Sequence, residues 1–366
     1  MPAKSVLVFG MTHNPGGMES VIMNYYRNIN PEQIHFDFLT NEKSIAYEDE
    51  IIEHGSKIFK ITARSQNPSK YRADLKDFFE KHASDYDAIW VNSCSLANID
   101  YLKYAKRYKI KKRIIHCHNS QNGESAIRHI LHHINRHLIS RYATDYWSCN
   151  KIANDWFFGK RLSRKRHIII INNAIDSSRF RFSKRNRINK RKELGFNDEL
   201  VVGHVGRFHR QKNQSFILDI FKEIISRRQN AHLVLVGQGE DEKMIRAKIS
   251  ALGIGDKVTI IKNRDDIPEL LCAFDLFLFP SLFEGFGLSL LEAEATNLPC
   301  LASKDVIPSE VAVNNSIQFL SLGKTASEWA DAAMAVAGSS RPIDNSFIIK
   351  HGFDIKTEAR KVADFF

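Results

Sequence analysis

The 366-residue sequence lacks the features that mark several classes of protein. It has no run of about 18 apolar residues, which argues against a transmembrane helix. The apolar run near the start, in MPAKSVLVFGM, is too short for a signal peptide and precedes no small-residue cleavage site, so we predict a first strand there. The five cysteines are far apart and have neither metal-ligand nor redox spacing. Reduced thiols and a cytoplasmic location follow from these absences.

Charge of one sign is, in contrast, abundant. The formal net charge is +11, and residues 101–166 hold sixteen Lys and Arg residues against three acidic ones. Dense basic runs lie at 106–113 and 160–166. Such a balance suits nucleic acid, an anionic membrane surface or an anionic substrate, and equally a solvated face with no partner.

Short apolar runs alternate with helical patterns along the whole chain, which predicts parallel α/β sheets. The pattern stops in the basic segment 177–197, which has few apolar residues, and restarts with a new first strand at 200–205. We therefore predict two Rossmann-like domains, 1–176 and 177–350, and a C-terminal helix within 351–366 that crosses back onto the first domain. A ligand is expected in a cleft between the two sheets.

Residues 275–303 contain the most informative pattern. The apolar run 276–279 predicts a buried strand, Gly285 and Gly287 lie in the loop that follows, and a helical pattern begins at Leu288. Asn297 tolerates the left-handed conformation that ends a helix. A glycine loop leading into a helix N-terminus predicts an anion site, because backbone N–H groups and the helix dipole point at the ligand.

Two glutamates accompany this loop. Glu284 lies in it, and Glu292 lies one turn inside the predicted helix. Carboxylates do not bind phosphate, but they accept hydrogen bonds from sugar or ribose hydroxyls. Arg207 and Lys212 follow the first strand of the second domain, so they are expected at the same sheet edge as the glycine loop. One guanidinium and one ammonium there would hold a diphosphate without a metal.

Residues 125–142 predict an amphipathic helix with apolar residues at helical spacing and a basic, histidine-rich opposite face. The favoured interpretation is that its apolar face packs on the sheet. The alternative is a helix lying on anionic lipid. Its histidines lack the third ligand or carboxylate that a metal site requires.

The segments GRFHRQKN, LVLVGQGE and PSLFEGFGLSLLEAEATNLPCLAS resemble the retaining glycosyltransferases of family 4, and chiefly members that build capsular or exopolysaccharide repeat units. The resemblance is clearest over residues 200–303. It implies the GT-B fold and metal-independent transfer of a hexose from a nucleotide-diphosphate sugar, UDP-linked rather than GDP-linked. That sugar nucleotide is a co-substrate, and no cofactor is implied. The implied acceptor is a lipid-linked saccharide, and the implied place is the cytoplasm or the inner face of the plasma membrane.

The resemblance also implies residue roles. Arg207 and Lys212 would bind the diphosphate, Glu284 the transferred sugar and Glu292 the ribose. His118 would lie near the anomeric centre, whereas His116 is expected on the other side of the same strand. The remaining implied donor-binding residues are Gly16, Gly17, Gly206, Arg264, Gly285, Phe286, Gly287 and Leu288.

Two alternatives stay open. A GT-B nucleotide-sugar epimerase would need no acceptor. A non-catalytic, basic nucleic-acid-binding protein would explain the charge, but the sequence has no recognition motif and no aromatic residues interleaved with the basic runs.

Overall fold

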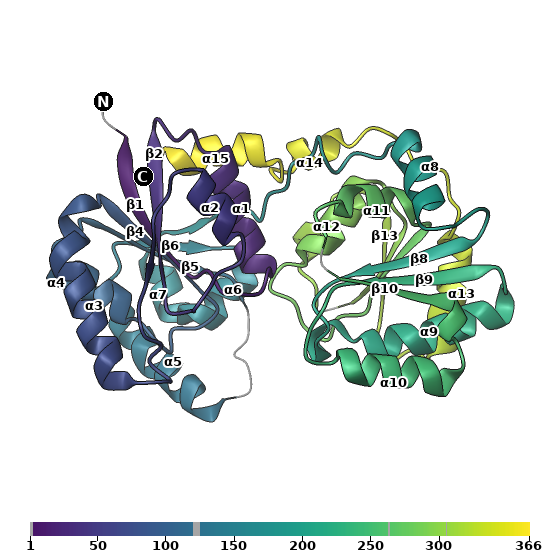
Figure 1. Cartoon of the computed structure of the whole chain (residues 1–366), viewed down its shortest axis with the longest axis horizontal. Coiled ribbons are helices and arrows are strands. Elements are labelled where there is room, and N and C mark those ends of the chain that lie inside the picture. Colours follow the sequence, from purple (N-terminus) through teal and green to yellow (C-terminus); the bar gives the residue numbers. More distant parts are fainter. Residues whose placement is uncertain (1–2, 120–124, 263, 305) are drawn as a thin grey trace. The chain divides into compact units, whose positions relative to one another are not determined.

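The structure, a computed structural model, describes residues 3–119, 125–262, 264–304 and 306–366. The chain forms two compact units (Figure 1): Met1–Ala174 together with Ile355–Phe366, and Ile175–Asp354. Within the described residues the first unit has a seven-stranded sheet and the second a six-stranded sheet, and every strand pair is parallel. The predicted pair of parallel α/β domains is therefore confirmed.

The sheet of the first unit has the strand order β3-β2-β1-β4-β5-β6-β7. Its strands are β1 Lys4–Phe9, β2 Ile34–Thr40, β3 Ile58–Lys60, β4 Ala88–Ser93, β5 Lys112–Cys117, β6 Asp145–Ser148 and β7 Ile168–Ile170. The order reverses between β1 and β4, and such a switch point is where open α/β sheets bind ligands, outside the carboxyl ends of the strands.

The helices of this unit are α1 Gly17–Asn28, α2 Glu48–Glu53, α3 Pro68–His82, α4 Asp100–Arg107, α5 Ala126–Leu138, α6 Lys151–Phe157, α7 Gly159–Lys165 and α15 Ile355–Ala363. The last helix lies beside α1 in Figure 1, in the unit that begins the chain. At the C-terminus, the ring of Phe366 packs against Phe36, Trp90 and Trp147 with centroids 5.5–6.0 Å apart. Aromatic burial thus attaches the terminal segment to the first sheet.

The second unit has the strand order β10-β9-β8-β11-β12-β13. Its strands are β8 Leu200–Val205, β9 Ala231–Val236, β10 Val258–Ile261, β11 Leu276–Phe279, β12 Cys300–Ser303 and β13 Ile317–Leu320. One apolar core lies between the sheet and α11 and α12, and another between the sheet and α9, α10 and α13. The helices are α8 Lys184–Glu193, α9 Gln214–Arg227, α10 Glu242–Leu252, α11 Ile267–Ala273, α12 Leu288–Ala295, α13 Ala326–Val336 and α14 Ser346–Lys350.

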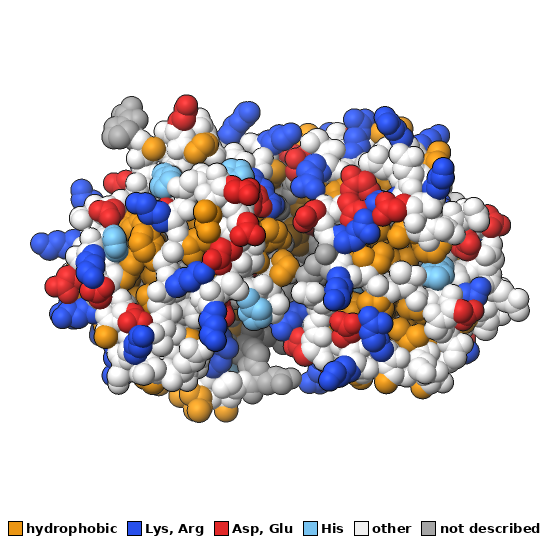
Figure 2. All heavy atoms as spheres, viewed as in Figure 1, with side chains coloured by type: hydrophobic (Ala, Val, Ile, Leu, Met, Phe, Trp, Pro, Cys, Tyr) orange, Lys and Arg blue, Asp and Glu red, His pale blue; other side chains and the backbone are white. Residues whose placement is uncertain are grey.

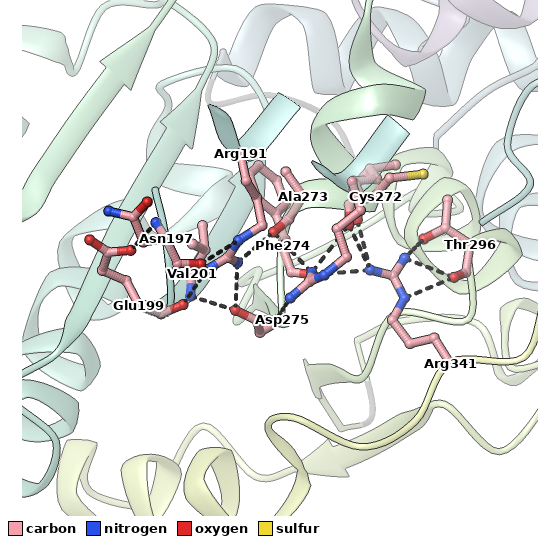
Figure 3. Close-up of polar contacts among 12 residues, drawn as sticks. Arg191, Asn197, Glu199, Val201, Cys272, Ala273, Phe274, Asp275, Thr296 and Arg341 are labelled. Carbon is pink, nitrogen blue, oxygen red and sulfur yellow. Dashed lines mark hydrogen bonds and ion pairs between the residues drawn. The ribbon is translucent and has the colours of Figure 1, made fainter. Parts of the chain in front are cut away.

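The basic segment 177–197 belongs to this second unit and contains α8. Two of its arginines are structural: Arg187 and Arg191 form ion pairs with Asp275, at 2.5 and 3.1 Å, and donate to carbonyl oxygens at the end of α11 (Figure 3). Arg341 donates to the same end of α11 and to Thr296. Cations at a helix C-terminus satisfy its last carbonyl groups, so part of the basic charge serves the fold and not a partner.

Helix α5 does not pack as the favoured interpretation expected. Its residues Ile127, Ile130 and Ile134 are 70%, 58% and 53% exposed, whereas His132 and Asn135 are buried. The reason is the loop after β4. There the N–H of Leu96 donates to Nδ1 of His132 at 3.1 Å, and Nδ2 of Asn135 donates to the Leu96 carbonyl at 2.7 Å. A buried loop needs polar partners, so the polar face of α5 turns inward.

The same loop explains why α4 begins at Asp100 and not earlier in the chain. The backbone groups of Leu96 are bonded to α5 and are not available to an α4 helix.

Candidate functional site

The switch point of the second sheet lies between β8 and β11, and the two loops that leave it there are joined. The N–H of Leu282 donates to the carbonyl of Gln211 at 2.8 Å, and Nδ2 of Asn213 donates to the carbonyl of Pro280 at 3.1 Å. Asn213 has φ 57°, a left-handed conformation that asparagine tolerates, and begins α9. Residues predicted from two distant segments are therefore brought to one edge of the sheet.

Lys212 and Glu284 meet at this edge. Nζ of Lys212 lies 2.7 Å from Oε1 of Glu284 and 4.7 Å from the centre of the Phe279 ring. The glutamate is buried, and its other oxygen accepts a hydrogen bond from Nε2 of Gln211 at 3.4 Å. The pair forms a low-dielectric site in which a further anion or hydroxyl group would interact strongly with both charges.

Arg207 lies on the same edge but has a different partner. Its guanidinium donates to both carboxylate oxygens of Glu240, at 3.1 and 3.3 Å, and the side chain is half exposed. His209 is 3.5 Å from the same carboxylate. Sequence reasoning missed Glu240 and His209, although Glu240 directly follows the glycines of the GQGE segment.

Those glycines allow the loops to approach one another. A Cβ atom at Gly237 would lie 2.1 Å from the carbonyl oxygen of Gly206, and one at Gly239 would lie 2.3 Å from that of Phe208. A Cβ at Gly206 would approach Nε2 of His204 and the Lys212 side chain to 3.2–3.3 Å. Gly206 therefore lies against the Lys212 side chain, and its contact with a donor stays a prediction.

The segment 284–288 forms the predicted glycine loop. Gly287 has φ 95°, in the left-handed region, and precedes α12, which begins at Leu288. Phe286 is buried, with its ring 5.4 Å from that of Phe353. Asn297 follows α12 with φ 53°, so the predicted left-handed end of the helix is confirmed. The N-terminus of α12 therefore lies where the sequence placed an anion site.

Glu292 is partly buried on α12. Burial raises the pKa of this carboxyl group to about 8, and the charges of Arg179 and Lys212 oppose the rise. At neutral pH the group is mostly protonated and can both donate and accept hydrogen bonds. Because the charge of Arg179 acts on Glu292, Arg179 is also a neighbour of the site. Sequence reasoning missed this residue. Its guanidinium donates to the carbonyl of Asp265 at 3.3 Å.

Arg264 is exposed, in the loop after the edge strand β10. It forms ion pairs with Asp266 and with Glu193 of α8, the latter at 2.9 Å. Its place beside a nucleobase stays a prediction.

In the first unit, His118 follows β5 and is buried. Nδ2 of Asn92 donates to the carbonyl of Phe9, which orients the amide so that its oxygen accepts from Nε2 of His118 at 2.8 Å. Burial lowers the pKa of His118 to about 3. The imidazole is thus neutral, with Nδ1 as a hydrogen-bond acceptor.

The prediction that His116 lies on the other side of the strand is wrong. The rings of His116 and His118 have centroids 4.1 Å apart. Residues two apart in a strand project from the same face, so the two rings lie side by side, tilted by 45°. His116 accepts a hydrogen bond from the indole N–H of Trp90 at 3.3 Å, and burial lowers its pKa.

Gly16 and Gly17 lie at the start of α1, after β1. The Glu19 carboxylate accepts hydrogen bonds from the Thr12 hydroxyl at 2.7 Å and from the Gly16 N–H at 3.1 Å. A Cβ at Gly16 would lie 2.8 Å from that carboxylate, whereas one at Gly17 would meet no heavy atom within 4 Å. Glu19 therefore holds this loop, and the space beside Gly17 is open.

Comparison with known proteins decides the class. A family model described as "Glycosyl transferases group 1" matches residues 186–340. EpsF of Bacillus subtilis (strain 168), a relative named as a glycosyltransferase, is 28% identical over 337 residues, which cover 90% of this chain and 86% of EpsF. The chain is a glycosyltransferase. Residues 186–340 are its group 1 domain.

Two further similarities extend this result. An Escherichia coli protein named UDP-Gal:alpha-D-GlcNAc-diphosphoundecaprenol alpha-1,3-galactosyltransferase is 33% identical over 140 residues, 37% of this chain and 36% of that protein. The crystal structure of Anabaena HepE in complex with UDP and glucose has a TM-score of 0.78, covers 99% of both chains and is 18% identical. This structural likeness confirms the predicted GT-B fold.

The group 1 domain of this glycosyltransferase contains Arg207, Lys212, Glu284, Glu292 and the start of α12. Along the ranges that the structure describes, no three His, Cys, Asp or Glu side chains cluster as potential metal ligands. The same ranges contain no helix with the length and apolar character needed to span a bilayer. The chemistry of the edge is that of two cations, three carboxyl groups and a helix N-terminus.

Proposed function

We propose that this glycosyltransferase moves a hexose from a nucleotide-diphosphate sugar, UDP-linked rather than GDP-linked, onto a lipid-linked saccharide, with retention of the anomeric configuration. The product would be a bacterial capsular or exopolysaccharide repeat unit. The observation that carries the proposal is the Lys212–Glu284 pair at the switch point, 2.7 Å apart in the group 1 domain. The edge combines a cation suited to a leaving phosphate with an acceptor suited to sugar hydroxyls.

Each group at the edge has a task in this reaction. Breaking the bond to the nucleotide develops negative charge on the diphosphate, and Lys212 and Arg207 neutralise it. The backbone amides at the start of α12 bind the distal phosphate. Glu284 accepts hydrogen bonds from the transferred sugar, and Glu292 exchanges hydrogen bonds with the ribose hydroxyls. The cations make a divalent metal unnecessary, so we propose metal-independent transfer.

Both cations are paired with carboxylates in the structure, which bears on donor binding. Lys212 is held by Glu284 and Arg207 by Glu240. A diphosphate entering this edge shares or replaces those partners, so affinity depends on the balance between the phosphate and the carboxylates. In the first unit, we propose that neutral His118, through its acceptor nitrogen, contacts the donor sugar or the anomeric centre. The small residues Gly16 and Gly17 would let a phosphate or the acceptor approach the backbone of the loop before α1.

The lipid-linked acceptor is supported by the name of the Escherichia coli relative, which specifies a diphosphoundecaprenol acceptor and UDP-galactose. Such an acceptor lies in a membrane leaflet. We therefore place the enzyme on the cytoplasmic face of the plasma membrane as a peripheral protein.

The test of donor chemistry is binding and hydrolysis by purified protein. Thermal shift against a panel of UDP- and GDP-sugars identifies the donor, since a ligand raises stability by mass action. Hydrolysis and transfer are expected to be unchanged by EDTA, and NMR of the first-formed product should show the donor's anomeric configuration. If no sugar nucleotide is bound or turned over, and Lys212→Ala changes nothing, the proposal fails.

The same assay separates the alternatives. Release of an epimerised sugar nucleotide without any acceptor would favour an epimerase. Strongly salt-dependent binding of DNA or RNA, with no response to sugar nucleotides, would favour a nucleic-acid-binding protein.

A further inference from the structure

Helix α5 exposes an apolar stripe. Ile127, Ile130 and Ile134 recur at spacings of three and four residues, so they share one face of the helix, and each is more than half exposed. Leu131 and Leu138 border them and are partly buried. Apolar side chains gather at the lower edge of the surface in Figure 2, where Figure 1 places α5. A contiguous exposed apolar face of this kind marks an interaction site.

The helix is nonetheless firmly held by its opposite side. His132 accepts from the N–H of Leu96, and its ring stacks on Trp156 with centroids 4.5 Å apart. Burial lowers the pKa of His132 to about 4, which matches its role as a hydrogen-bond acceptor. These polar contacts of His132 and Asn135 hold α5 on the unit, so the helix does not depend on burial of its isoleucines, which remain exposed to solvent.

Basic residues lie on one side of the stripe. A pocket of about 370 Å³ lies next to it, lined by Leu131 and Asn135 of α5 and by Arg64, Arg72, Asp100 and Lys103. Asp100 pairs with Lys103 at 2.9 Å and with Arg64 at 3.5 Å, so the pocket holds three cations and one carboxylate. Its excess positive charge and its size suit a phosphate headgroup.

The basic run 160–166 contacts α5 on the side away from the stripe. A Cβ at Gly159, the first residue of α7, would lie 3.2 Å from the Arg136 side chain of α5. Beyond that contact α7 carries Lys160, Arg161, Arg164 and Lys165. At the end of the 3-10 turn after α5, Nζ of Lys106 donates to the carbonyl of Arg141. The two basic runs therefore contact the far side of α5 and the turn that follows it, and the cations next to the stripe itself are those of the pocket.

We propose that α5 and the Arg64–Arg72–Lys103 pocket form a membrane-docking surface, with the three isoleucines inserted into an anionic lipid leaflet and the pocket taking a lipid phosphate. An apolar stripe beside a cationic pocket fits a bilayer of anionic headgroups over acyl chains, whereas a protein partner would need acidic groups to match the pocket. The choice of the cytoplasmic leaflet rests on the proposed function, because a lipid-linked acceptor would lie in that leaflet.

Vesicle co-sedimentation tests the surface with the full chain and no sugar donor. The wild-type protein is expected to bind phosphatidylcholine vesicles that contain phosphatidylglycerol, and to bind them less as salt rises. The triple variant I127S/I130S/I134S should bind about 1,000-fold more weakly, from roughly tenfold for each of the three isoleucines removed from the acyl boundary. The matched variant I52S/I188S/I349S removes isoleucines that are 55%, 67% and 52% exposed elsewhere and should bind within about twofold of wild type.

A second variant tests the pocket. R64A/R72A should weaken binding by about tenfold or more on phosphatidylglycerol vesicles, and should leave binding to pure phosphatidylcholine unchanged. Wild-type protein that stays in the supernatant with both vesicle types would overturn the proposal, and so would equal losses in the two isoleucine triples. Self-association that disappears in I127S/I130S/I134S while vesicle binding persists would assign the stripe to a second copy of the chain.

Sugar-nucleotide binding, measured for the same variants without vesicles, keeps this result separate from the proposed function. If vesicle binding follows the expected pattern and no sugar nucleotide binds, the docking surface stands and the proposed function fails. If sugar nucleotides bind and vesicles do not, the opposite holds.

Discussion

Replacing Lys212 by methionine removes the charge of the switch-point pair and retains the apolar length that packs on Phe279. The Lys212 and Glu284 side chains are 16% and 5% exposed and form a 2.7 Å ion pair. Removing one partner of a buried pair costs about 3–5 kcal/mol, because the other charge is left uncompensated. Gln211 still donates to Glu284, so we expect a loss in the free energy of unfolding of about 2–3 kcal/mol.

The double variant K212M/E284Q should regain most of that stability, because no charge is then left buried. K248M is the matched control: Lys248 pairs with Asp219 at 2.6 Å, but the two side chains are 25% and 40% exposed. Loss of that pair should cost at most about 1 kcal/mol.

Urea denaturation measures the stabilities, and donor hydrolysis measures function. Hydrolysis should fall by about 100-fold or more in both K212M and the double variant, since neither can stabilise the leaving diphosphate. Two results would refute the reasoning. One is a K212M unfolding midpoint equal to that of K248M. The other is wild-type turnover in the stable double variant, which would show that Lys212 serves only the fold.

Three further predictions concern the rest of the site and its support. Glu292→Gln should flatten the pH dependence of stability. The pKa of Glu292 in the folded state, about 8, lies above the unfolded value of roughly 4.3, so the wild type loses stability as pH rises through this window. Thermal melts from pH 5 to 9 should therefore show the stabilities of the two proteins diverging. Gly16→Ala should lower donor turnover and thermal stability, because its Cβ would lie 2.8 Å from a glutamate oxygen, whereas Gly17→Ala, in open space, should leave stability within about 0.5 kcal/mol; equal melts would contradict this. Gly203→Ala should destabilise the second unit by about 3 kcal/mol or more, because its Cβ would lie 2.0 Å from the Phe274 ring; an unchanged urea midpoint would show that the ring can move away.

Local pattern predicted the elements that hold the site. The apolar run at β11, the glycine loop and the end of α12 at Asn297 follow from burial, turn chemistry and capping, which depend on neighbouring residues. The placement of Lys212 beside Glu284 required one more step. Both follow parallel strands, so their loops leave one edge of the sheet, and the strand order puts β8 next to β11. The separate pairing of Arg207 with Glu240 was not predictable, since Glu240 comes from a third loop.

By itself, the sequence determined the parallel α/β architecture, the glycine loop before α12 and the chemical types of the groups at that edge, because strand burial, turns and caps are local. Only the tertiary structure decided which way α5 faces. Periodicity showed that the isoleucines of α5 share one face of the helix, and an apolar face is usually predicted to pack against the core. The loop at Leu96 needed hydrogen-bond partners more than the core needed further apolar area, so His132 and Asn135 face inward and the isoleucines face out.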